Sequence, residues 1–318
     1  MRLLLVKTSS LGDVIHNLPV LSDLRVVFPD AQIDWCVEEA FVEIVRLHPA
    51  VAEIIPVALR RWRKTLGRRA TWQEIVAFKK CLSATPYDAI LDTQGLIKSG
   101  VIARLANGRR YGYAAEVARE ALAARCYDEG FVIPPNAHAI ERNRWLAAAA
   151  FNYPLDLPLD YGIVAPASDL PWLPPTTRVA VLLTATSRDD KLWEEARWVA
   201  LAQALAERGV TSVFPSGSLR ERERVVRLAA AVPGAIVAPP LGLSALAGLL
   251  GQAQVVVGVD TGLVHLACAL NRPSLALYTA TDPALTGVYG RGFCRNLGAP
   301  GRSPAWREVF AVVDQVLS

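Results

Sequence analysis

Residues 1–19 read MRLLLVKTSSLGDVIHNLP, an apolar run followed by a polar loop and a second apolar segment. The run at residues 3–6 predicts a β-strand, because it is far shorter than the roughly 18 apolar residues that a membrane-spanning helix needs. Lys7 and three hydroxyl residues begin the loop, which carries Asp13 into a predicted helix at residues 14–28. A strand, a loop and a helix in this order begin a parallel α/β unit, whose functional side chains gather where the strands end.

The same alternation continues along the chain. In the first half, strands are predicted at residues 32–37 and 89–92 and a helix at residues 41–47. In the second half, the pattern predicts strands at residues 178–183, 211–215, 254–259 and 274–278, and helices at residues 193–208, 219–231, 243–251 and 264–270. Such alternation implies parallel sheets with crossover helices. We therefore expect an α/β fold of two Rossmann-like, doubly wound domains that face a central cleft.

A change in composition separates the two predicted domains. The chain has 318 residues, more than one domain usually has. Residues 153–175 are rich in proline and have no amphipathic period, as expected of a linker. We expect an N-terminal domain at residues 1–155, a linker at 156–175, a C-terminal domain at 176–300, and a last helix at 301–318 that packs back on the N-terminal domain.

Composition sets broad limits on the class of protein. Hydrophobic residues make up 52% and charged residues 20%, which excludes a disordered chain. The net charge of +4 says little about partners. The five cysteines are widely spaced, with no CxxC pair, so we expect buried, reduced thiols and neither a disulfide framework nor a zinc site. Without a signal-peptide pattern or a run of transmembrane length, the expected location is cytoplasmic.

Asp13 has two possible roles. It follows the first predicted strand by a short loop and lies near the start of the next helix, where an aspartate is often only a helix cap. The loop is, however, more polar than a cap requires, and Gly12 allows close approach of another group. A carboxylate in such a cleft can act as a general base.

The segment VVVGVDTGLVHLACAL, residues 255–270, places polar side chains after a second buried strand. Asp260 ends the strand, Thr261 and Gly262 turn the chain, and His265 lies in the first turn of the next helix. Backbone amides at a helix start, with a threonine hydroxyl, can bind a phosphate oxygen. The alternatives are a plain threonine cap and a core histidine, and no GxGxxG or Walker pattern is present.

Two further segments carry charge. TATSRDDKLW, residues 184–193, combines hydroxyls at Thr186 and Ser187 with the cation Lys191, which suits a diphosphate leaving group but is equally typical of a solvated helix start. LRRWRK, residues 59–64, has few acids near it. It predicts a docking patch for a polyanion, such as a membrane surface or a nucleic acid, although such runs are usually solvated faces.

With these stretches in place, the chain resembles the ADP-heptose glycosyltransferase family, glycosyltransferase family 9, and within it the branch called lipopolysaccharide heptosyltransferase I. The segments that carry the resemblance occur in the family's order and span most of the chain: KTSSLGDVIHNLP, IIPVALRRWRK, YDAILDTQGLIKS, SRDDKLW, GVDTGLVHL and TDPALTGVYG. The resemblance implies a GT-B fold, with an acceptor site in the N-terminal domain and a donor site in the C-terminal domain.

The implied reaction moves L-glycero-D-manno-heptose from ADP-heptose to Kdo of Kdo2-lipid A in the lipopolysaccharide inner core, with inversion. ADP-heptose is then a substrate, and no cofactor and no metal is expected. The resemblance also implies peripheral contact with the anionic cytoplasmic face of the inner membrane and no nucleic-acid partner.

The resemblance also assigns roles to single residues. Asp13 is implied to be the base that deprotonates the Kdo hydroxyl, and Lys191 to stabilise the leaving group. The basic residues implied to meet Kdo carboxylates and lipid A phosphates are Arg60, Arg61, Arg63 and Lys64. The positions implied to bind the donor's phosphates, heptose and ribose are Thr186, Ser187, Lys191, Glu221, Asp260, Thr261, Gly262 and His265.

The chain departs from the family pattern at three places. YTATDP at residues 278–283 stands where the family has YGPTDP, Ser187 replaces a threonine, and SGSLRE at residues 216–221 lacks a frequent tryptophan. These changes leave the role of the first loop and the contact to adenine open. Two alternatives remain: an enzyme that adds the second heptose, and a non-catalytic module that binds a nucleotide sugar or a polyanion.

Overall fold

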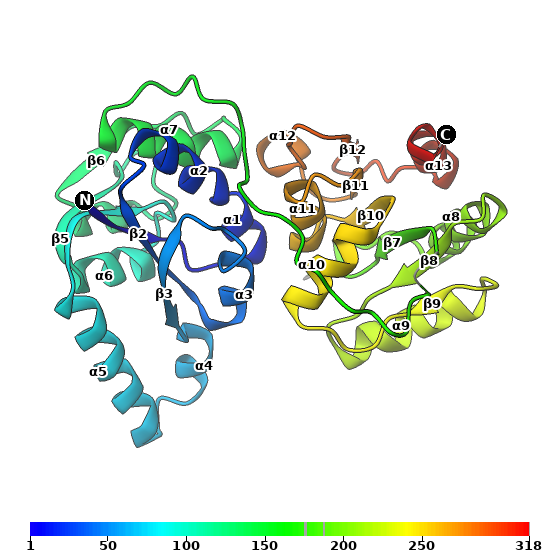
Figure 1. The fold of residues 1–318 in the computed structure, drawn as a ribbon, viewed down its shortest axis with the longest axis horizontal. Helices are drawn as coiled ribbons and strands as arrows, with labels where there is room; N and C mark the ends of the chain where they lie inside the picture. The colour runs from blue at the N-terminus through cyan, green and yellow to red at the C-terminus, as the bar shows by residue number, and fades with distance from the viewer. Residues whose placement is uncertain (175–176, 187, 318) are drawn as a thin grey trace. The chain divides into compact units, whose positions relative to one another are not determined.

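The computed structural model describes residues 1–174, 177–186 and 188–317. The chain forms two compact units, Met1–Gly162 and Ile163–Ser318. Each unit contains its own parallel sheet with helices on both faces (Figure 1). The boundary follows residue 162 rather than residue 155, so residues 156–162 of the expected linker belong to the N-terminal unit.

The N-terminal unit is built on a six-stranded sheet in the order β3-β2-β1-β4-β5-β6. All its strand pairs are parallel, and β1 lies between β2 and β4. The strands are β1 (Arg2–Val6), β2 (Gln32–Glu38), β3 (Val51–Val57), β4 (Pro86–Asp92), β5 (Asn107–Tyr113) and β6 (Glu129–Phe131). The predicted first strand is thus at the centre of the sheet, where both of its faces are buried.

Helices cover the two faces of this sheet. Leu4 and Val6 of β1 point to one face, where they join a core with Trp62, Leu82 and Ile102 from three helices. The helices are α1 (Leu11–Ile15), α2 (Leu18–Val27), α3 (Val42–Val45), α4 (Leu59–Lys64), α5 (Arg69–Ala84), α6 (Ile97–Leu105) and α7 (Ala139–Phe151), with short 3-10 turns η1 (Glu39–Phe41) and η2 (Ala121–Cys126).

The helix predicted at residues 14–28 is in fact two helices. α1 ends at Ile15 and α2 begins at Leu18, with Pro19 in its first turn. Proline has no backbone N–H to continue the hydrogen bonding of α1, whereas it fits the first turn of a new helix. The break leaves α1 as a short helix that carries Asp13.

A buried ion pair fixes the end of the N-terminal unit. Arg144 on α7 donates two hydrogen bonds to Asp23 on α2, at 2.7 and 3.0 Å, and a third to the carbonyl of Leu157 at 2.8 Å. Burial raises the pKa of Asp23 even beside this guanidinium. The pair thereby ties the segment after α7 to the helical layer, which is why residues beyond 155 belong to this unit.

The C-terminal unit repeats the same plan. Its six parallel strands have the order β12-β11-β10-β7-β8-β9. They are β7 (Val179–Leu183), β8 (Thr211–Phe214), β9 (Ile236–Val237), β10 (Val255–Val259), β11 (Ser274–Tyr278) and β12 (Cys294–Gly298). Counted within each unit, both sheets follow the order 3-2-1-4-5-6 that characterises doubly wound dinucleotide-binding folds.

The helices of this unit are η3 (Asp189–Lys191), α8 (Glu195–Glu207), α9 (Leu219–Ala230), α10 (Leu243–Gln252), α11 (Gly262–Ala269), α12 (Pro283–Thr286) and α13 (Trp306–Leu317). The prediction that the last helix packs back on the N-terminal domain is wrong. Val309 and Val313 of α13 lie in the core of the C-terminal unit, beside Trp198 and Leu201 of α8. Their apolar stripe is therefore buried within its own unit.

In both sheets the strand order reverses between the first and the fourth strand of the unit. The reversal lies between β1 and β4 in the N-terminal unit and between β7 and β10 in the C-terminal unit. Ligands of doubly wound folds bind at the carboxyl ends of the strands at this point. Asp13 follows β1, Thr186 follows β7 and Asp260 follows β10, so three predicted site residues lie in the segments after these strands.

Candidate active site

In the N-terminal unit, the loop after β1 is fixed by the loop after β4. The side-chain oxygen of Gln94 accepts hydrogen bonds from the backbone N–H and the hydroxyl of Thr8, at 2.7 and 2.8 Å, and its amide nitrogen donates to the carbonyl of Ser9 at 2.9 Å. Lys98 on α6 donates to the hydroxyl of Ser9 at 2.9 Å. The loop that leads to Asp13 is thus held at both its backbone and its side chains.

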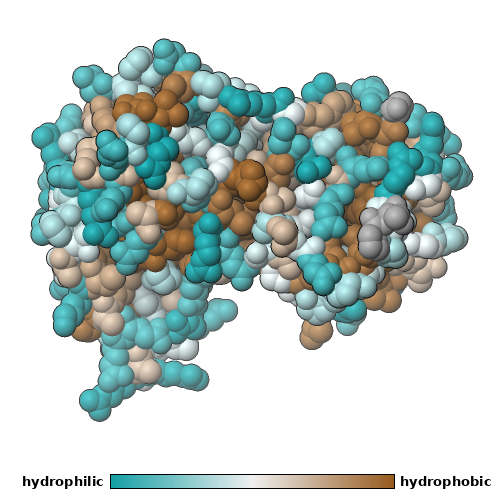
Figure 2. Space-filling model, viewed as in Figure 1, coloured by the Kyte–Doolittle hydropathy of each residue, from teal (hydrophilic) through white to brown (hydrophobic). Residues whose placement is uncertain are grey.

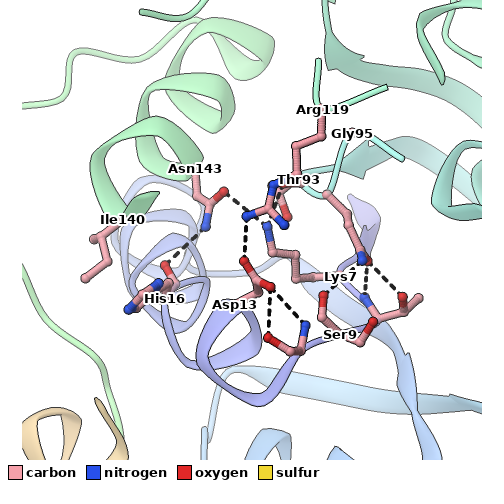
Figure 3. A network of polar contacts seen from close by, with 12 residues as sticks. Lys7, Ser9, Asp13, His16, Thr93, Gly95, Arg119, Ile140 and Asn143 are labelled. Carbon is pink, nitrogen blue, oxygen red and sulfur yellow. Dashed lines mark hydrogen bonds and ion pairs between the residues drawn. The ribbon is translucent and has the colours of Figure 1, made fainter. Parts of the chain in front are cut away.

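Lys7 ends β1 as a buried cation. Its side chain is almost fully buried, and its ammonium donates to the carbonyl of Thr93 at 2.7 Å and to Asn143 Oδ1 at 3.4 Å. Figure 3 shows this ammonium between α7 and the loop after β4, close to Asp13. A buried lysine needs such partners because desolvation penalises its charged form.

Asp13 lies in the first turn of α1 and completes a capping box with Ser10. Its Oδ2 accepts hydrogen bonds from the backbone N–H and the hydroxyl of Ser10, both at 3.0 Å. Its other oxygen, Oδ1, accepts from Arg119 Nη2 at 2.7 Å. The N-cap is therefore Ser10 and not Asp13, which lies at the N3 position of the capping box and has in addition a cationic partner that capping does not need.

Arg119 reaches Asp13 because Gly95 lets its segment approach. Gly95 has a φ of +67°, a left-handed conformation that favours glycine, and its carbonyl accepts from the backbone N–H of Glu120 at 3.0 Å. A Cβ atom at Gly95 would lie 3.4 Å from the backbone nitrogen of Arg119. The close approach of these two segments delivers the guanidinium to Asp13.

Two cations determine the charge of Asp13. Burial alone would raise its pKa, but the charges of Lys7 and Arg119 outweigh burial and hold the pKa of Asp13 below the usual range of an aspartate. Burial lowers the pKa of Lys7 to about 8, although Asp13 acts in the opposite direction. Asp13 is thus an ionised carboxylate at neutral pH, and a weak base for as long as it stays paired with Arg119.

In the C-terminal unit, the residues after β7 meet those after β10. Lys191 forms an ion pair with Asp260 Oδ2 at 2.6 Å, and the hydroxyl of Thr186 donates to the backbone carbonyl of Asp260 at 2.8 Å. The hydroxyl of Thr281 donates to the same Oδ2 at 2.8 Å. The predicted donor residues Thr186, Lys191 and Asp260 are therefore brought together, and the altered YTATDP loop adds a hydroxyl to the cluster.

The remaining predicted donor residues occupy three places. Thr261 is the N-cap residue of α11, Gly262 is its first residue, and His265 is buried within its first turns. Glu221 lies in the first turn of α9, where its carboxylate accepts from the backbone N–H of Gly217 at 2.7 Å. Ser187 lies outside the described residues.

A cavity of about 620 Å³ opens beside this cluster. Thr186 lines it from the loop after β7, and Ser218, Glu221 and Arg224 line it from α9 and its N-cap. Its volume lies in the range of small-ligand sites, roughly 300–1,000 Å³. It links Glu221 to Thr186 within one hollow, although neither Lys191 nor Asp260 is among its lining residues in the described part of the chain.

The basic run at residues 59–64 forms α4, and its residues are not equivalent. Arg61 is held by Glu39 and Glu74, at 3.0 and 2.8 Å, so the expectation that few acids lie near this run is wrong for Arg61. The guanidinium of Arg60 lies over the ring of Phe41, and Arg63 and Lys64 are exposed. Figure 2 shows mainly hydrophilic side chains over the part of the molecule that Figure 1 labels α4 and α5.

Reasoning from the sequence missed Arg119 and Thr281 as site residues. Arg119 lies 106 positions from Asp13, in an irregular segment after β5 that has no recognisable pattern. Thr281 belongs to the loop whose role was left open because its sequence departs from the family's. Arg119 follows β5 and Thr281 follows β11, the neighbours of β4 and β10, so only the strand order of each sheet could have suggested that these segments come near Asp13 and Asp260.

Two features are absent from the residues that the structure describes. There, no helix is both long and apolar enough to cross a membrane. In the same part of the chain, histidine, cysteine and acidic residues form no group of three or more that could hold a metal ion.

Comparison with known proteins decides the family. The family model described as glycosyltransferase family 9 (heptosyltransferase) matches residues 75–304. The chain belongs to glycosyltransferase family 9. It is 46% identical over 293 residues to a Pseudomonas aeruginosa protein named lipopolysaccharide heptosyltransferase 1, which covers 92% of this chain and 82% of that protein. This glycosyltransferase is therefore an enzyme, as the resemblance predicted.

Two solved structures of an Escherichia coli relative share its fold. The structure of heptosyltransferase WaaC with ADP superposes with a TM-score of 0.92 at 40% identity, covering 99% of this chain and 100% of that one. The structure of WaaC with ADP-2-deoxy-2-fluoro heptose gives a TM-score of 0.87 at 40% identity, with 99% and 98% covered. The predicted α/β, GT-B class of fold is confirmed by these matches.

Replacing Arg119 with alanine is expected to raise the pKa of Asp13, because one of the two cations that stabilise its ionised form is removed. In the wild-type protein the pKa of Asp13 is lower in the folded than in the unfolded chain. Asp13 therefore stabilises the folded state above about pH 4, and this stabilisation is lost as the pH falls. The variant should lose that stability at a higher pH. Carboxyl carbon NMR on aspartate-labelled protein measures the midpoint directly.

Arg125→Ala is the matched control, since Arg125 is an exposed arginine six positions along the same region. It should leave the titration of Asp13 at the wild-type position. An unchanged midpoint in Arg119→Ala would show that the ion pair does not govern the charge of Asp13.

Proposed function

We propose that this glycosyltransferase transfers L-glycero-D-manno-heptose from ADP-heptose to a hydroxyl of Kdo in Kdo2-lipid A, with inversion at the anomeric carbon. The reaction adds the first heptose of the lipopolysaccharide inner core. The relatives support the substrate class, through the name of the Pseudomonas aeruginosa protein and the ligands of the Escherichia coli structures. The observation that carries the mechanism is the ionised Asp13 in the first turn of α1, the helix that follows β1.

In the acceptor half of the reaction, Asp13 acts as the general base. Its carboxylate takes the proton of the Kdo hydroxyl while that oxygen forms a bond to the anomeric carbon of heptose. Ser10 holds the carboxylate through two hydrogen bonds, so its position is defined before the acceptor binds. A direct displacement of this kind inverts the anomeric configuration, because no covalent intermediate with the enzyme is formed.

The low pKa of Asp13 has to rise for this carboxylate to act as an efficient general base. A general base works best when its pKa is near the working pH, and the ion pair with Arg119 moves Asp13 away from that optimum. The side chain of Arg119 is 43% exposed, so an anionic acceptor can compete for it. A Kdo carboxylate that binds Arg119 would weaken its hold on Asp13 and raise the pKa of the base.

In the donor half, Lys191 stabilises the leaving group. The bond from the anomeric carbon to the diphosphate oxygen breaks, and negative charge develops on ADP. Lys191 donates to Asp260 in the free enzyme, and turning its ammonium to the diphosphate would leave Asp260 to accept from heptose hydroxyls. Thr261 and Gly262 at the start of α11 would supply backbone donors to phosphate oxygens, with His265 beside them.

Glu221 suits the nucleoside end of the donor. Its carboxylate borders the cavity that also reaches Thr186, and carboxylates commonly bind ribose hydroxyls. Ser187 is proposed to add a hydroxyl to the same phosphate or heptose contacts. No cofactor or metal takes part in the proposed reaction, in which protein cations neutralise the leaving group.

The remaining basic residues suit the polyanionic acceptor. Arg60, Arg63 and Lys64 on α4 are exposed, and we assign them contacts with Kdo carboxylates and lipid A phosphates. Arg61 would contribute less, because Glu39 and Glu74 already neutralise it. The proposed enzyme works at the cytoplasmic face of the inner membrane, in peripheral contact with anionic lipid, and has no nucleic-acid partner.

Replacing Asp13 with asparagine is expected to lower turnover by roughly 10²–10⁴, the range for losing a general base. Asparagine keeps the shape of the side chain but cannot take the proton. The assay follows ADP release and heptosylated product from ADP-heptose and Kdo2-lipid A. The variant should still bind ADP with nearly wild-type affinity.

Asp156→Asn, which alters an exposed aspartate, is the control and should keep wild-type turnover. If Asp13→Asn turns over normally, the role of Asp13 as base is excluded. If the wild-type enzyme binds donor but heptosylates no acceptor, the chain is a binding module instead. Preference for an acceptor that already carries heptose would favour the enzyme that adds the second heptose.

Replacing Lys191 with alanine is expected to slow transfer by roughly 10²–10³ at saturating donor, as for other single charge-stabilising contacts. Steady-state kinetics with ADP-heptose as the varied substrate separates this loss from weaker donor binding. Lys80→Ala, at an exposed position on α5, should have no effect. Unchanged turnover in Lys191→Ala would show that another cation stabilises the leaving group.

A further inference from the structure

Two cysteines that are distant in the sequence meet beside Gly290 in the C-terminal unit. Cys268 is buried on α11, and Cys294 is partly exposed at the first position of β12. β12 pairs with β11, and α11 packs on β11, so one strand brings the two elements together. A Cβ atom added at Gly290 would lie 2.7 Å from Cys268 Sγ and 3.4 Å from Cys294 Sγ. Both sulfurs therefore border the same small space.

The two thiols also influence each other. A hydrogen bond between them raises the pKa of Cys268 and lowers the pKa of Cys294, and the nearby guanidinium of Arg295 lowers the latter further. Cys294 combines a more acidic thiol with access to solvent, the two properties that make a cysteine reactive.

The other three cysteines lie in the N-terminal unit. Cys36 is buried, and burial strongly raises the pKa of its thiol. Cys81 is exposed on α5 and Cys126 is partly exposed at the end of η2. The expectation that all the thiols are buried is therefore wrong for Cys81.

We propose that Cys268 and Cys294 form a peroxide-sensitive thiol pair, in which Cys294 reacts with a hydroperoxide and Cys268 converts the product into an intramolecular disulfide. The site is separate from the transfer chemistry and does not depend on the proposed function. A disulfide needs sulfurs that can approach one another without large movement of the backbone. Two sulfurs that border the same glycine are placed for such an approach.

The chemistry takes two steps. The Cys294 thiolate attacks one peroxide oxygen, an S–O bond forms, the O–O bond breaks, and the departing hydroxide takes up a proton, leaving a sulfenic acid. The Cys268 thiol then loses its proton and attacks the Cys294 sulfur, so that an S–S bond forms and hydroxide leaves as water. In sum, two thiols are oxidised and one hydrogen peroxide is reduced to two waters.

The pair makes oxidation reversible. A sulfenic acid without a neighbouring thiol can be oxidised further to sulfinic acid, which thiol reductants do not restore. Closure of the disulfide by Cys268 removes the sulfenic acid before that step. Under reducing conditions the pair remains a dithiol, in accord with the transient nature of disulfides in reducing compartments.

The test treats the full-length protein with hydrogen peroxide, blocks free thiols, and maps the peptides by mass spectrometry without reduction. The expected product is a peptide pair that joins Cys268 to Cys294 and disappears after treatment with dithiothreitol. Cys268→Ser should instead give a Cys294 sulfenic acid that dimedone traps, and then sulfinic acid. Cys294→Ser, at the more exposed position, should give neither the crosslink nor oxidation of Cys268.

Two further variants complete the test. Cys81→Ser should leave the yield of the crosslink unchanged, since Cys81 lies on the other unit. Gly290→Ala should lower the yield several-fold, because its methyl group displaces the Cys268 sulfur. Sulfinic acid at Cys294 without any crosslink in the wild type, or oxidation of Cys81 while the pair stays reduced, would overturn the proposal.

Discussion

The reversal of strand order within each sheet is the constraint on which the sites of this protein depend. Both sheets place their first and fourth strands side by side, with the crossover helices diverging to opposite faces. Loops that follow two adjacent parallel strands then end at one edge and must pack on one another. Lys7 meets Thr93 there in the N-terminal unit, and Lys191 meets Asp260 in the C-terminal unit. Each contact joins the end of a first strand to the end of a fourth.

The same plan gives the two units different electrostatics. In the N-terminal unit, one carboxylate lies among cations, so Asp13 is ionised and well held but weakly basic. In the C-terminal unit, the ammonium of Lys191 is paired with the carboxylate of Asp260, which also accepts a hydrogen bond from the hydroxyl of Thr281. Both arrangements keep a charged group in place through partners that a charged substrate can replace. That property suits a reaction in which an anionic acceptor and an anionic leaving group both have to be bound.

Much of the fold was predictable because buried parallel strands are continuous apolar runs. Residues 3–6, 254–259 and 274–278 are such runs, and they became β1, β10 and β11 nearly as predicted. The split of α1 from α2 depends on Pro19, a helix-start signal that the sequence itself carries. The last helix was misplaced because an apolar stripe does not show which sheet it will cover, and α13 covers its own.

The site was predictable only in the segments that follow the first and fourth strand of each unit. Asp13, Lys191 and Asp260 lie in such segments, and the polar residues after these strands signalled them. Arg119 and Thr281 depend on tertiary packing, Arg119 through the approach of Gly95 and Thr281 through a loop with altered sequence. Likewise, the sequence showed a basic run at residues 59–64 but not that Arg61 is already neutralised by Glu39 and Glu74.

The central claim is that Asp13 acts as the general base in a direct displacement at the anomeric carbon of heptose. The anomeric configuration of the product tests it most directly, by NMR of the sugar formed by the wild-type enzyme from ADP-heptose of known configuration and a Kdo-bearing acceptor. The account predicts complete inversion, with one ADP released for each heptose transferred. Retention of configuration would contradict it, because retention requires a different course of reaction from the direct displacement assigned to Asp13.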